Sequence, residues 1–340
     1  KMGFFQKTKN MTDTNLLLAI TMIVFFAMYI GAMIFEGKGF LKAQTFLNML
    51  NANAALIIAS CGMSIVMITG SIDISVGGVA ALVSMCCAVY LDYHGGNVVT
   101  AIFISLGIGL LFGLVQGYLV AYLDIQPFIV SLAGMFFARG MTTIVNTEPF
   151  NVQNEAFVKL KETRVIVPGL GSVNKLGKYV NAYVEIGVVV ALILVIVLFC
   201  MLRWSKSGRN FYAVGGNQQS ALMLGINVKK TKFMAHLLCS LLAGIGGFVY
   251  FMHVGSGSAS HATGMEMNAI ASSIIGGTML TGGVGNIIGT LFGVLSLSTI
   301  QNIVSSAGLD QAWWTGITIA AMLCLFLVIQ SVVMSRKKKA

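Results

Sequence analysis

The chain has 340 residues, of which 57% are hydrophobic and only 9% are charged, and its mean hydropathy is +0.88. A soluble domain carries about 25% charged residues, so this composition excludes an ordinary soluble globular protein. The formal net charge is +10, yet the basic residues stand in short clusters between long uncharged runs instead of forming one face. Loops that flank membrane helices have this pattern, and we predict an all-α polytopic membrane protein that binds lipid and no nucleic acid.

The uncharged runs predict about ten transmembrane helices in a single membrane domain, residues 1–340. A lone lipid-exposed segment satisfies its backbone polar groups only as a helix. The predicted spans are 16–35, 53–69, 74–91, 98–122, 128–145, 182–202, 233–253, 266–280, 286–305 and 313–333. A glycine-rich break at 281–285 separates the eighth span from the ninth and is equally consistent with a re-entrant turn, which leaves nine or eleven spans as alternatives.

The distribution of Lys and Arg predicts the orientation of these spans. With both termini inside, thirteen basic residues lie in inside loops, including an acid-free cluster in the loop 203–232. Seven lie in outside loops, five of them mixed with acidic residues in the long loop 146–181. The bias therefore favours an even number of spans with both termini in the cytoplasm.

Two predicted spans share a ladder of three glycines spaced four residues apart. The ladders are Gly109, Gly113 and Gly117 in the fourth span, and Gly285, Gly289 and Gly293 in the ninth. This spacing places the glycines on one helical face, where they allow close helix packing. Because the two spans run in opposite directions within equivalent blocks, the ladders predict an inverted repeat, although such spacing is also common in unrelated apolar helices.

Nothing in the sequence predicts a catalytic or metal centre. The four histidines and six cysteines lack the spacing of metal ligands, and no GxxxxGK[ST] phosphate loop is present. We therefore predict a transporter subunit that is not itself an enzyme and carries no cofactor of its own. Uphill transport would draw on an ion gradient or on a separate subunit.

Three charged residues approach the predicted membrane interior: Asp73, Arg139 and Glu266. Asp73 precedes the third span, where it would either cap that helix or face the substrate pathway. Arg139 would snorkel or form a pair, and Glu266 would act at the start of the eighth span as Asp73 does at the third. Charges this sparse and peripheral argue against a proton relay.

The loop 203–232 is about thirty residues long and basic. Gly215, Gly216 and Asn217 predict a turn, and the following residues predict a short helix that ends at Gly225. A structured basic loop suggests docking to a partner. The alternative, contact with anionic lipid, would explain the lysines but not the turn and the helix.

Several segments resemble the monosaccharide permeases of bacterial ABC importers. Residues 208–217 with Ala221 and 225–226 resemble the coupling segment of that family, and 70–77 resembles its first signature. Residues 266–271, 275–278, 282–285 and 289–293 resemble its second signature. Segments 128–140 and 313–315 look closest to permeases assigned to galactofuranose. The chain departs from the common pattern at Ile74, where the family has Leu, and at Asn268, where it has Asp.

The resemblance implies a permease of the bacterial inner membrane with the ten-helix importer fold. Its partners would be a second permease, identical or paralogous, two cytoplasmic ATPases that hold ATP and Mg²⁺, and a periplasmic sugar-binding protein. The ATPase would contact a coupling site at Gly208, Arg209, Gly215, Gly216, Asn217, Ala221 and Gly225. The segment 146–181 would meet the binding protein.

A neutral sugar is recognised through hydroxyl and amide groups. Candidates near the pathway are Asn51, Asn53, Ser75, Ser131 and Asn268, beside Asp73 and Glu266, and each neutral candidate could instead simply bond to a neighbouring helix. The same architecture serves branched-chain amino acids and nucleosides, but the shortage of interior charge favours a neutral solute over a zwitterion. A secondary carrier without an ATPase is the alternative from a different class.

Overall fold

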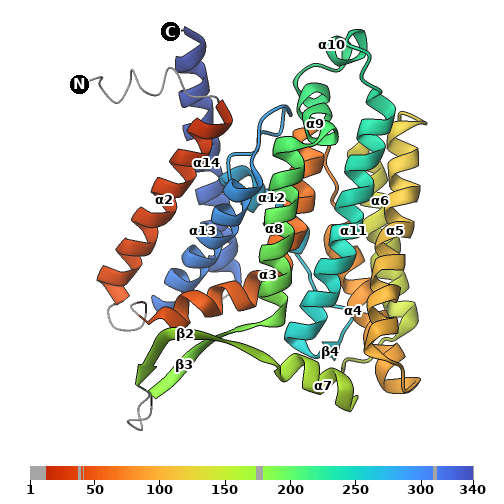
Figure 1. Cartoon of the computed structure of the whole chain (residues 1–340), viewed down its shortest axis with the longest axis vertical. Helices are drawn as coiled ribbons and strands as arrows, with labels where there is room; N and C mark the ends of the chain where they lie inside the picture. The colour runs from red at the N-terminus through yellow and green to blue at the C-terminus, as the bar shows by residue number, and fades with distance from the viewer. Residues whose placement is uncertain (1–12, 37–39, 41, 174–178, 309–311, 340) are drawn as a thin grey trace.

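The computed structural model describes residues 13–36, 40, 42–173, 179–308 and 312–339, which form a bundle of long helices (Figure 1). Within this described part, nine helices are long and apolar enough to cross a membrane. They are α2 (Asp13–Glu36), α3 (Ala43–Ile68), α4 (Val76–Tyr93), α5 (Val98–Ala121), α6 (Pro127–Val145), α8 (Ile186–Trp204), α11 (Val228–Val254), α13 (Ile287–Ser306) and α14 (Ala312–Lys339). The prediction of an all-α polytopic membrane protein is confirmed.

The two ends of the bundle differ in structure (Figure 1). One end, which we call the terminal face, carries the start of α2, the end of α14, and the short helices α9 (Lys206–Gly216) and α10 (Gln218–Met223). The other end, the hairpin face, carries α7 (Glu155–Glu162), the strands β2 (Arg164–Val173) and β3 (Tyr179–Glu185), and the short pair β1 (Phe150–Asn151) and β4 (Ser256–Gly257). Both strand pairs are antiparallel.

The segment predicted as the eighth span, 266–280, with a re-entrant turn as the alternative, does not form a full-length transmembrane helix. Its helix, α12 (Met265–Ile275), has 11 residues and is therefore about 16 Å long, half of the roughly 30 Å hydrocarbon core. Gly277, with φ of 88°, has the left-handed conformation that ends the helix, and Gly282 and Gly283, with φ of 86° and 76°, turn the chain back in the loop that follows. The chain still crosses the bundle here, since α11 ends at the hairpin face and α13 begins at the terminal face (Figure 1).

Two further boundaries differ from the prediction. Helix α3 begins at Ala43, ten residues before the predicted span, because polar residues continue it beyond the apolar run. Gln44 in this added part exchanges hydrogen bonds of 3.2 and 2.9 Å with the backbone of Tyr183. Residues 182–185 belong to strand β3, so the sixth span begins at Ile186.

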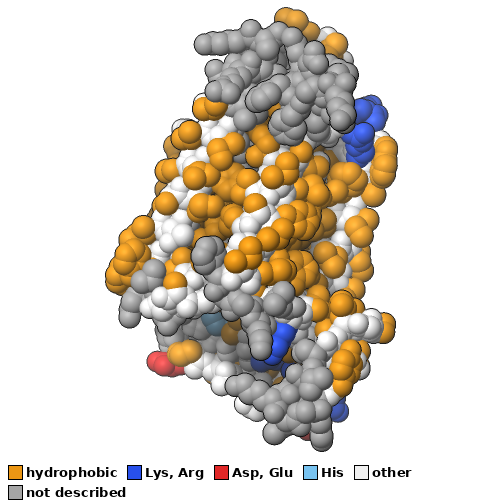
Figure 2. Space-filling view, turned by 90° about the vertical axis from the view of Figure 1, so that its left-hand side faces the viewer, with side chains coloured by type: hydrophobic (Ala, Val, Ile, Leu, Met, Phe, Trp, Pro, Cys, Tyr) orange, Lys and Arg blue, Asp and Glu red, His pale blue; other side chains and the backbone are white. Residues whose placement is uncertain are grey.

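The interior of the bundle is formed by α3, α4 and α11, most of whose residues are buried. Helix α11 lies against α3, α4 and α5, whereas α2, α6 and α14 are peripheral and expose apolar side chains. Figure 2 shows one such side: hydrophobic side chains cover its middle, and charged side chains appear toward its upper and lower parts. An apolar belt between two polar ends suits a bilayer.

Candidate coupling and translocation sites

The segment between α8 and α11 forms two helices separated by a single residue. Ser205 caps α9 by accepting a 3.0 Å hydrogen bond from the backbone of Gly208. A Cβ at Gly208 would lie 2.6 Å from Leu202 Cα, so this sharp corner requires glycine. Arg209 is exposed and donates to the carbonyl of Trp204 at 3.1 Å. The sequence therefore sets α9 directly against the end of α8.

The predicted turn at 215–217 is narrower than expected. Gly215 and Gly216 belong to the last turn of α9, and only Asn217 breaks the helix. Its side chain caps α10 by accepting from the backbone of Ser220 at 2.8 Å. Gly225, with φ of 77°, ends the short helix as predicted, and the amide of Ile226 donates to the carbonyl of the buried Ala221.

The base of α9 touches two distant segments directly through the backbone, in a contact that we call the glycine junction (Gly215, Gly216, Gly282, Gly283 and Ile68). A Cβ at Gly215 would meet the carbonyl oxygen of Ile68 and lie 2.6 Å from the amide of Gly283. The amide of Gly283 in turn donates to the Ile68 carbonyl at 2.9 Å. The end of α3, the end of α9 and the loop 276–286 therefore meet with no side chains between them.

Tyr212 adds a side-chain link beside the glycine junction. Its hydroxyl donates to the carbonyl of Gly285 at 2.9 Å, just before α13. Burial raises the pKa of Tyr212 to about 12, and the positive charge of Arg203 lowers it by a smaller amount. The phenol is therefore neutral at physiological pH and remains a hydrogen-bond donor.

The tip of the segment is apolar and exposed. Leu222, Met223 and Leu224 in and after α10 are 65%, 87% and 78% exposed. Three exposed large apolar side chains, two in α10 and one directly after it, form a candidate protein contact, since apolar groups gathered on a surface mark interaction sites. Sequence reasoning found the short helix but not which of its side chains face outward.

Asp73 lies in the break between α3 and α4 and is fully buried. It accepts hydrogen bonds from the backbone and the hydroxyl of Ser75 at 3.0 and 2.6 Å, and Ser240 lies 3.5 Å away. Ser75 also accepts from Gln116 at 2.9 Å. Ser75 is the N-cap residue of α4 and makes no side-chain capping bond of its own, whereas Asp73 accepts the Ser75 backbone N–H at the start of this helix. It is an interior carboxylate instead of a peripheral one.

His236 on α11 is a buried residue that sequence reasoning missed. It is fully buried on α11, one turn before Ser240, which lies 3.5 Å from Asp73, and neither of its ring nitrogens has a hydrogen-bond partner within the described ranges. No local signal announces this arrangement, because Asp73 and α11 are far apart in the chain. Packing alone brings them together.

Arg139 and Glu266 meet where α6, α12 and the loop 255–264 come together. Arg139 donates to the carbonyls of His261 and Ala262, the latter at 2.8 Å, and lies 4.0 Å from Glu266. A Cβ at Gly77 would meet the Glu266 carboxylate, so the negative charge faces the first turn of α4. Burial, and then the charge of Arg139, lower the pKa of His261, which keeps its ring neutral. Arg139 is thus paired.

The neutral pathway candidates divide into four that are bonded internally and one that is not. Asn51 accepts from the amide of Glu185 at 2.9 Å, and Asn53 donates to Met49 and Ser298 at 2.8 and 2.9 Å. Ser75 bonds Asp73 and Gln116, and Ser131 donates to Phe128. Asn268 is partly exposed, and its amide group has no partner among the residues that the structure describes.

Hydroxyl groups not singled out in the sequence join the half-length helix to its neighbours. Ser64 on α3 hydrogen-bonds Ser273 on α12 at 3.0 Å and Thr290 on α13 at 2.6 Å. The last carbonyls of α12 are also satisfied: Gln330 of α14 donates to Ile274 at 2.6 Å, and Thr21 of α2 donates to Ile275 at 2.8 Å. A helix that ends inside the membrane needs such partners for its free carbonyls.

Both glycine ladders lie in tight helix contacts, but their partners differ. Gly109, Gly113 and Gly117 face α11, at Ser240, Leu237 and Phe233. Gly289 and Gly293 face α12, at Gly276 and Ser272, and Gly285 faces Ile68 and Thr278. The inverted repeat stays a prediction.

The described residues contain no group of three or more His, Cys, Asp or Glu side chains placed to hold a metal ion. The prediction of no cofactor in this chain is not tested by that observation.

These features define an α-helical membrane transport protein, with a broken helix in the bundle interior and a structured segment at one face. The chain belongs to the family described as branched-chain amino acid transport system / permease component, whose model matches residues 45–327. No solved structure matches it.

Named relatives are similar along most of the chain. The inner membrane ABC transporter permease protein YjfF of Escherichia coli K12 is 35% identical over 94% of this chain and 93% of its own length. The fructose import permease protein FruG of Bifidobacterium longum is 34% identical over 83% of this chain and 81% of its own length. The ribose import permease protein RbsC of Escherichia coli K12 is 32% identical over 80% of this chain and 81% of its own length. The resemblance to sugar permeases of ABC importers is confirmed.

Proposed function

We propose that this chain is a membrane-spanning permease subunit of an ABC importer and carries a monosaccharide across the bacterial inner membrane. The observation that carries the proposal is the glycine junction, which joins the exposed helix α10 through α9 to the interior breaks next to α4 and α12. The relatives named for ribose and fructose import support the solute class. The sequence lacks a phosphate loop, so ATP and Mg²⁺ would be held by partner subunits.

In this proposal the terminal face is cytoplasmic and both chain ends lie there. The acid-free basic loop 203–232 supports this orientation, since positively charged loops stay on the inside. The hairpin face, with 146–181, would then meet a periplasmic sugar-binding protein. A second permease, identical or paralogous, would complete the pathway.

An ATPase subunit would dock on Leu222, Met223 and Leu224, where apolar area is exposed at the end farthest from the bundle. Movement of α10 passes to α9 through Asn217, and from α9 to Ile68 and Gly283 through backbone contacts. Because these contacts contain no flexible side chains, a displacement of α9 shifts the end of α3 and the start of α13. This gives ATP-driven motion a route to the half-length helix α12.

Asn268 would contact the sugar. Its amide group is free among the described residues and can both donate and accept, as a sugar hydroxyl requires. The neighbouring Met267 is 58% exposed, so this side of α12 is open. Asp73, Arg139 and Glu266 have partners within the bundle, which leaves a neutral group for the solute.

The docking proposal is tested by changing Leu222, Met223 and Leu224 together to Ser. We expect loss of the co-purifying ATPase and of ATP-driven uptake, with the chain still folded. The matched control changes Val165, Ile166 and Leu170, which are 43%, 61% and 45% exposed on the hairpin face, and keeps the ATPase. Gradient-driven uptake by the isolated chain in liposomes would instead establish a secondary carrier.

The substrate proposal is tested with Asn268→Ala in the assembled importer. Loss of one hydrogen bond to the solute is expected to raise the half-saturation concentration about fivefold. Asn53→Ala, which removes an internal bond, should change thermal stability instead. Uptake is compared for galactofuranose, ribose, xylose and fructose, and transport of leucine in their place would contradict the sugar assignment.

A further inference from the structure

A cavity of about 580 Å³ lies at the terminal face, between the first turns of α2 and α13 and the adjoining ends of α8 and α9. Its lining has two parts of different chemistry. The apolar part includes Leu18, Phe199 and Ile288, and the polar part includes Thr14, Arg203 and Tyr212. None of the described side chains that line it is acidic.

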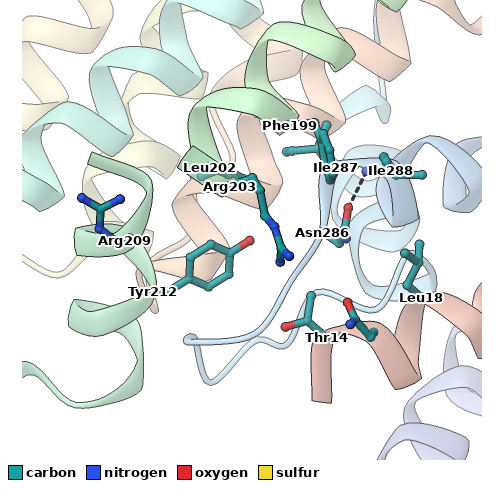
Figure 3. Close-up of a pocket in the computed structure, with 11 residues that line it drawn as sticks. Thr14, Leu18, Phe199, Leu202, Arg203, Arg209, Tyr212, Asn286, Ile287 and Ile288 are labelled. Atoms are coloured by element: carbon teal, nitrogen blue, oxygen red, sulfur yellow. Dashed lines mark hydrogen bonds between the residues drawn. The ribbon is translucent and has the colours of Figure 1, made fainter. Parts of the chain in front are cut away.

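Arg203 supplies the charge of this cavity. Figure 3 shows its side chain reaching into the space beside Tyr212 and toward Thr14, whereas Arg209 points away. Arg203 has no hydrogen-bond or ion-pair partner in the part of the chain that the structure describes, while Arg209 is bonded to Trp204. The Tyr212 hydroxyl is committed to Gly285 and is neutral, so it does not neutralise Arg203. Among the described side chains, the positive charge of Arg203 in the cavity is therefore unmatched.

The position of Trp204 indicates the depth of this charge in the bilayer. Trp204 ends α8 next to Arg203, is 68% exposed, and packs edge-on against Phe199 at 6.3 Å between ring centroids. Exposed Trp side chains in membrane proteins favour the level of the lipid headgroups. Arg203 thus lies at headgroup depth, and the apolar part of the cavity faces the hydrocarbon.

We propose that this cavity binds one anionic phospholipid, with its phosphate at Arg203 and an acyl chain along Phe199 and Ile288. A free phosphate or nucleotide would use the charge but leave the apolar part unfilled. The basic segment 1–12, with three lysines and no acidic residue, would repel Arg203. With the terminal face cytoplasmic, as in the proposed function, this lipid belongs to the inner leaflet; only that assignment rests on the proposed function. The bound lipid would contact α8, α9 and α13 together, next to the coupling segment.

The test uses the full chain purified in a zwitterionic detergent, without ATPase or sugar. Native mass spectrometry compares retention of phosphatidylglycerol with that of phosphatidylcholine. Wild type is expected to prefer phosphatidylglycerol, Arg203→Gln to lose about fivefold of that preference, and Arg203→Lys to keep most of it. Arg164→Gln is the control, because Arg164 stacks 4.1 Å from the Tyr183 ring on the opposite face. An unchanged preference in Arg203→Gln would overturn the proposal.

A second measurement locates the lipid without any substitution. Photoactivatable phosphatidylglycerol is expected to label peptides that contain 199–212, and excess inorganic phosphate should not displace it. Displacement by phosphate would show a free-anion site instead. The substitution Asp13→Asn tests for an internal partner of Arg203. Retention of phosphatidylglycerol should not change. A higher retention in this variant would mean that Asp13 competes with the lipid for Arg203, which would overturn the unmatched charge. Because neither experiment involves transport, failure of the proposed function would leave these results unaffected.

Discussion

The two glycine ladders have the same spacing but connect to different parts of the molecule. The α5 ladder packs along α11, a helix of 27 residues, and holds two full-length helices together. The α13 ladder packs on the 11-residue α12 and continues into the glycine junction through Gly285, which accepts from Tyr212. One ladder is part of the bundle interior, and the other lies between the interior and the terminal face.

The difference shows that glycine spacing determines how close two helices approach but not what the contact does. A ladder against a long helix has neighbouring residues that fix it on both sides. A ladder against a half-length helix borders the loop 276–286, which is in backbone contact with the end of α9. We therefore expect substitutions in the α5 ladder to act mainly on folding and those in the α13 ladder to act also on uptake.

The largest effect is expected for Gly113→Leu. A Cβ at Gly113 would lie 2.9 Å from Leu237 Cα, so a leucine forces α5 away from α11 at a cost of about 3 kcal/mol or more. Size-exclusion chromatography after detergent extraction should show little folded protein. Gly107→Leu on the same helix is the control, since no atom lies within 4 Å of its Cβ position. Normal folding of Gly113→Leu would remove the packing argument.

Gly289→Leu should have a smaller effect on folding, because the loop after α12 can yield. Its Cβ would meet the backbone of Gly276, which displaces the end of α12. We expect reduced yield together with loss of uptake in the protein that does fold. Gly316→Leu, at an exposed position of α14 with no atom within 4 Å, should resemble wild type. If Gly289→Leu unfolds the chain as fully as Gly113→Leu, the two ladders contribute equally to folding and the proposed difference between them is wrong.

Tyr212→Phe is the mildest change and removes only the hydrogen bond to Gly285. The expected loss in free energy of unfolding is about 1 kcal/mol at pH 7. The pKa of Tyr212 is raised from 10 to about 12 in the folded protein, so its contribution is complete below pH 10 and is lost as the pH rises toward 12. The measurement is the free energy of unfolding of wild type and of Tyr212→Phe between pH 8 and 12. A difference between the two that stays constant over this range would contradict the role of the phenol.

Local features of the sequence predicted several elements well. The apolar runs placed the long helices, and Gly225 placed the end of α10. The sequence left the extent of α12 open, because the uncharged run 267–309 has no marker for the end of a helix except its glycines. It also failed to place Gly215 and Gly216 inside α9, because glycines in a polar segment are typical of turns.

The arrangement of the site depended on contacts between residues far apart in the chain. Asp73 with Ser240, Glu266 with Gly77, and the Ile68 carbonyl with Gly283 have no common local pattern. The caps of α12 are another case, since Thr21 and Gln330 come from opposite ends of the chain. Among five neutral pathway candidates, only the folded structure separates Asn268 from those that are bonded internally.

The amino-acid sequence by itself determined that this protein lies in a membrane and where its long helices run. These properties follow from composition and local spacing, because hydrophobic transfer and backbone hydrogen bonding act on each segment separately. The tertiary structure alone decided that α12 ends inside the bundle, that α9 touches two interior breaks, and that Arg203 faces a cavity whose described side chains supply no counter-charge. Those properties depend on which backbones approach each other, and such approach is decided by the packing of all helices together.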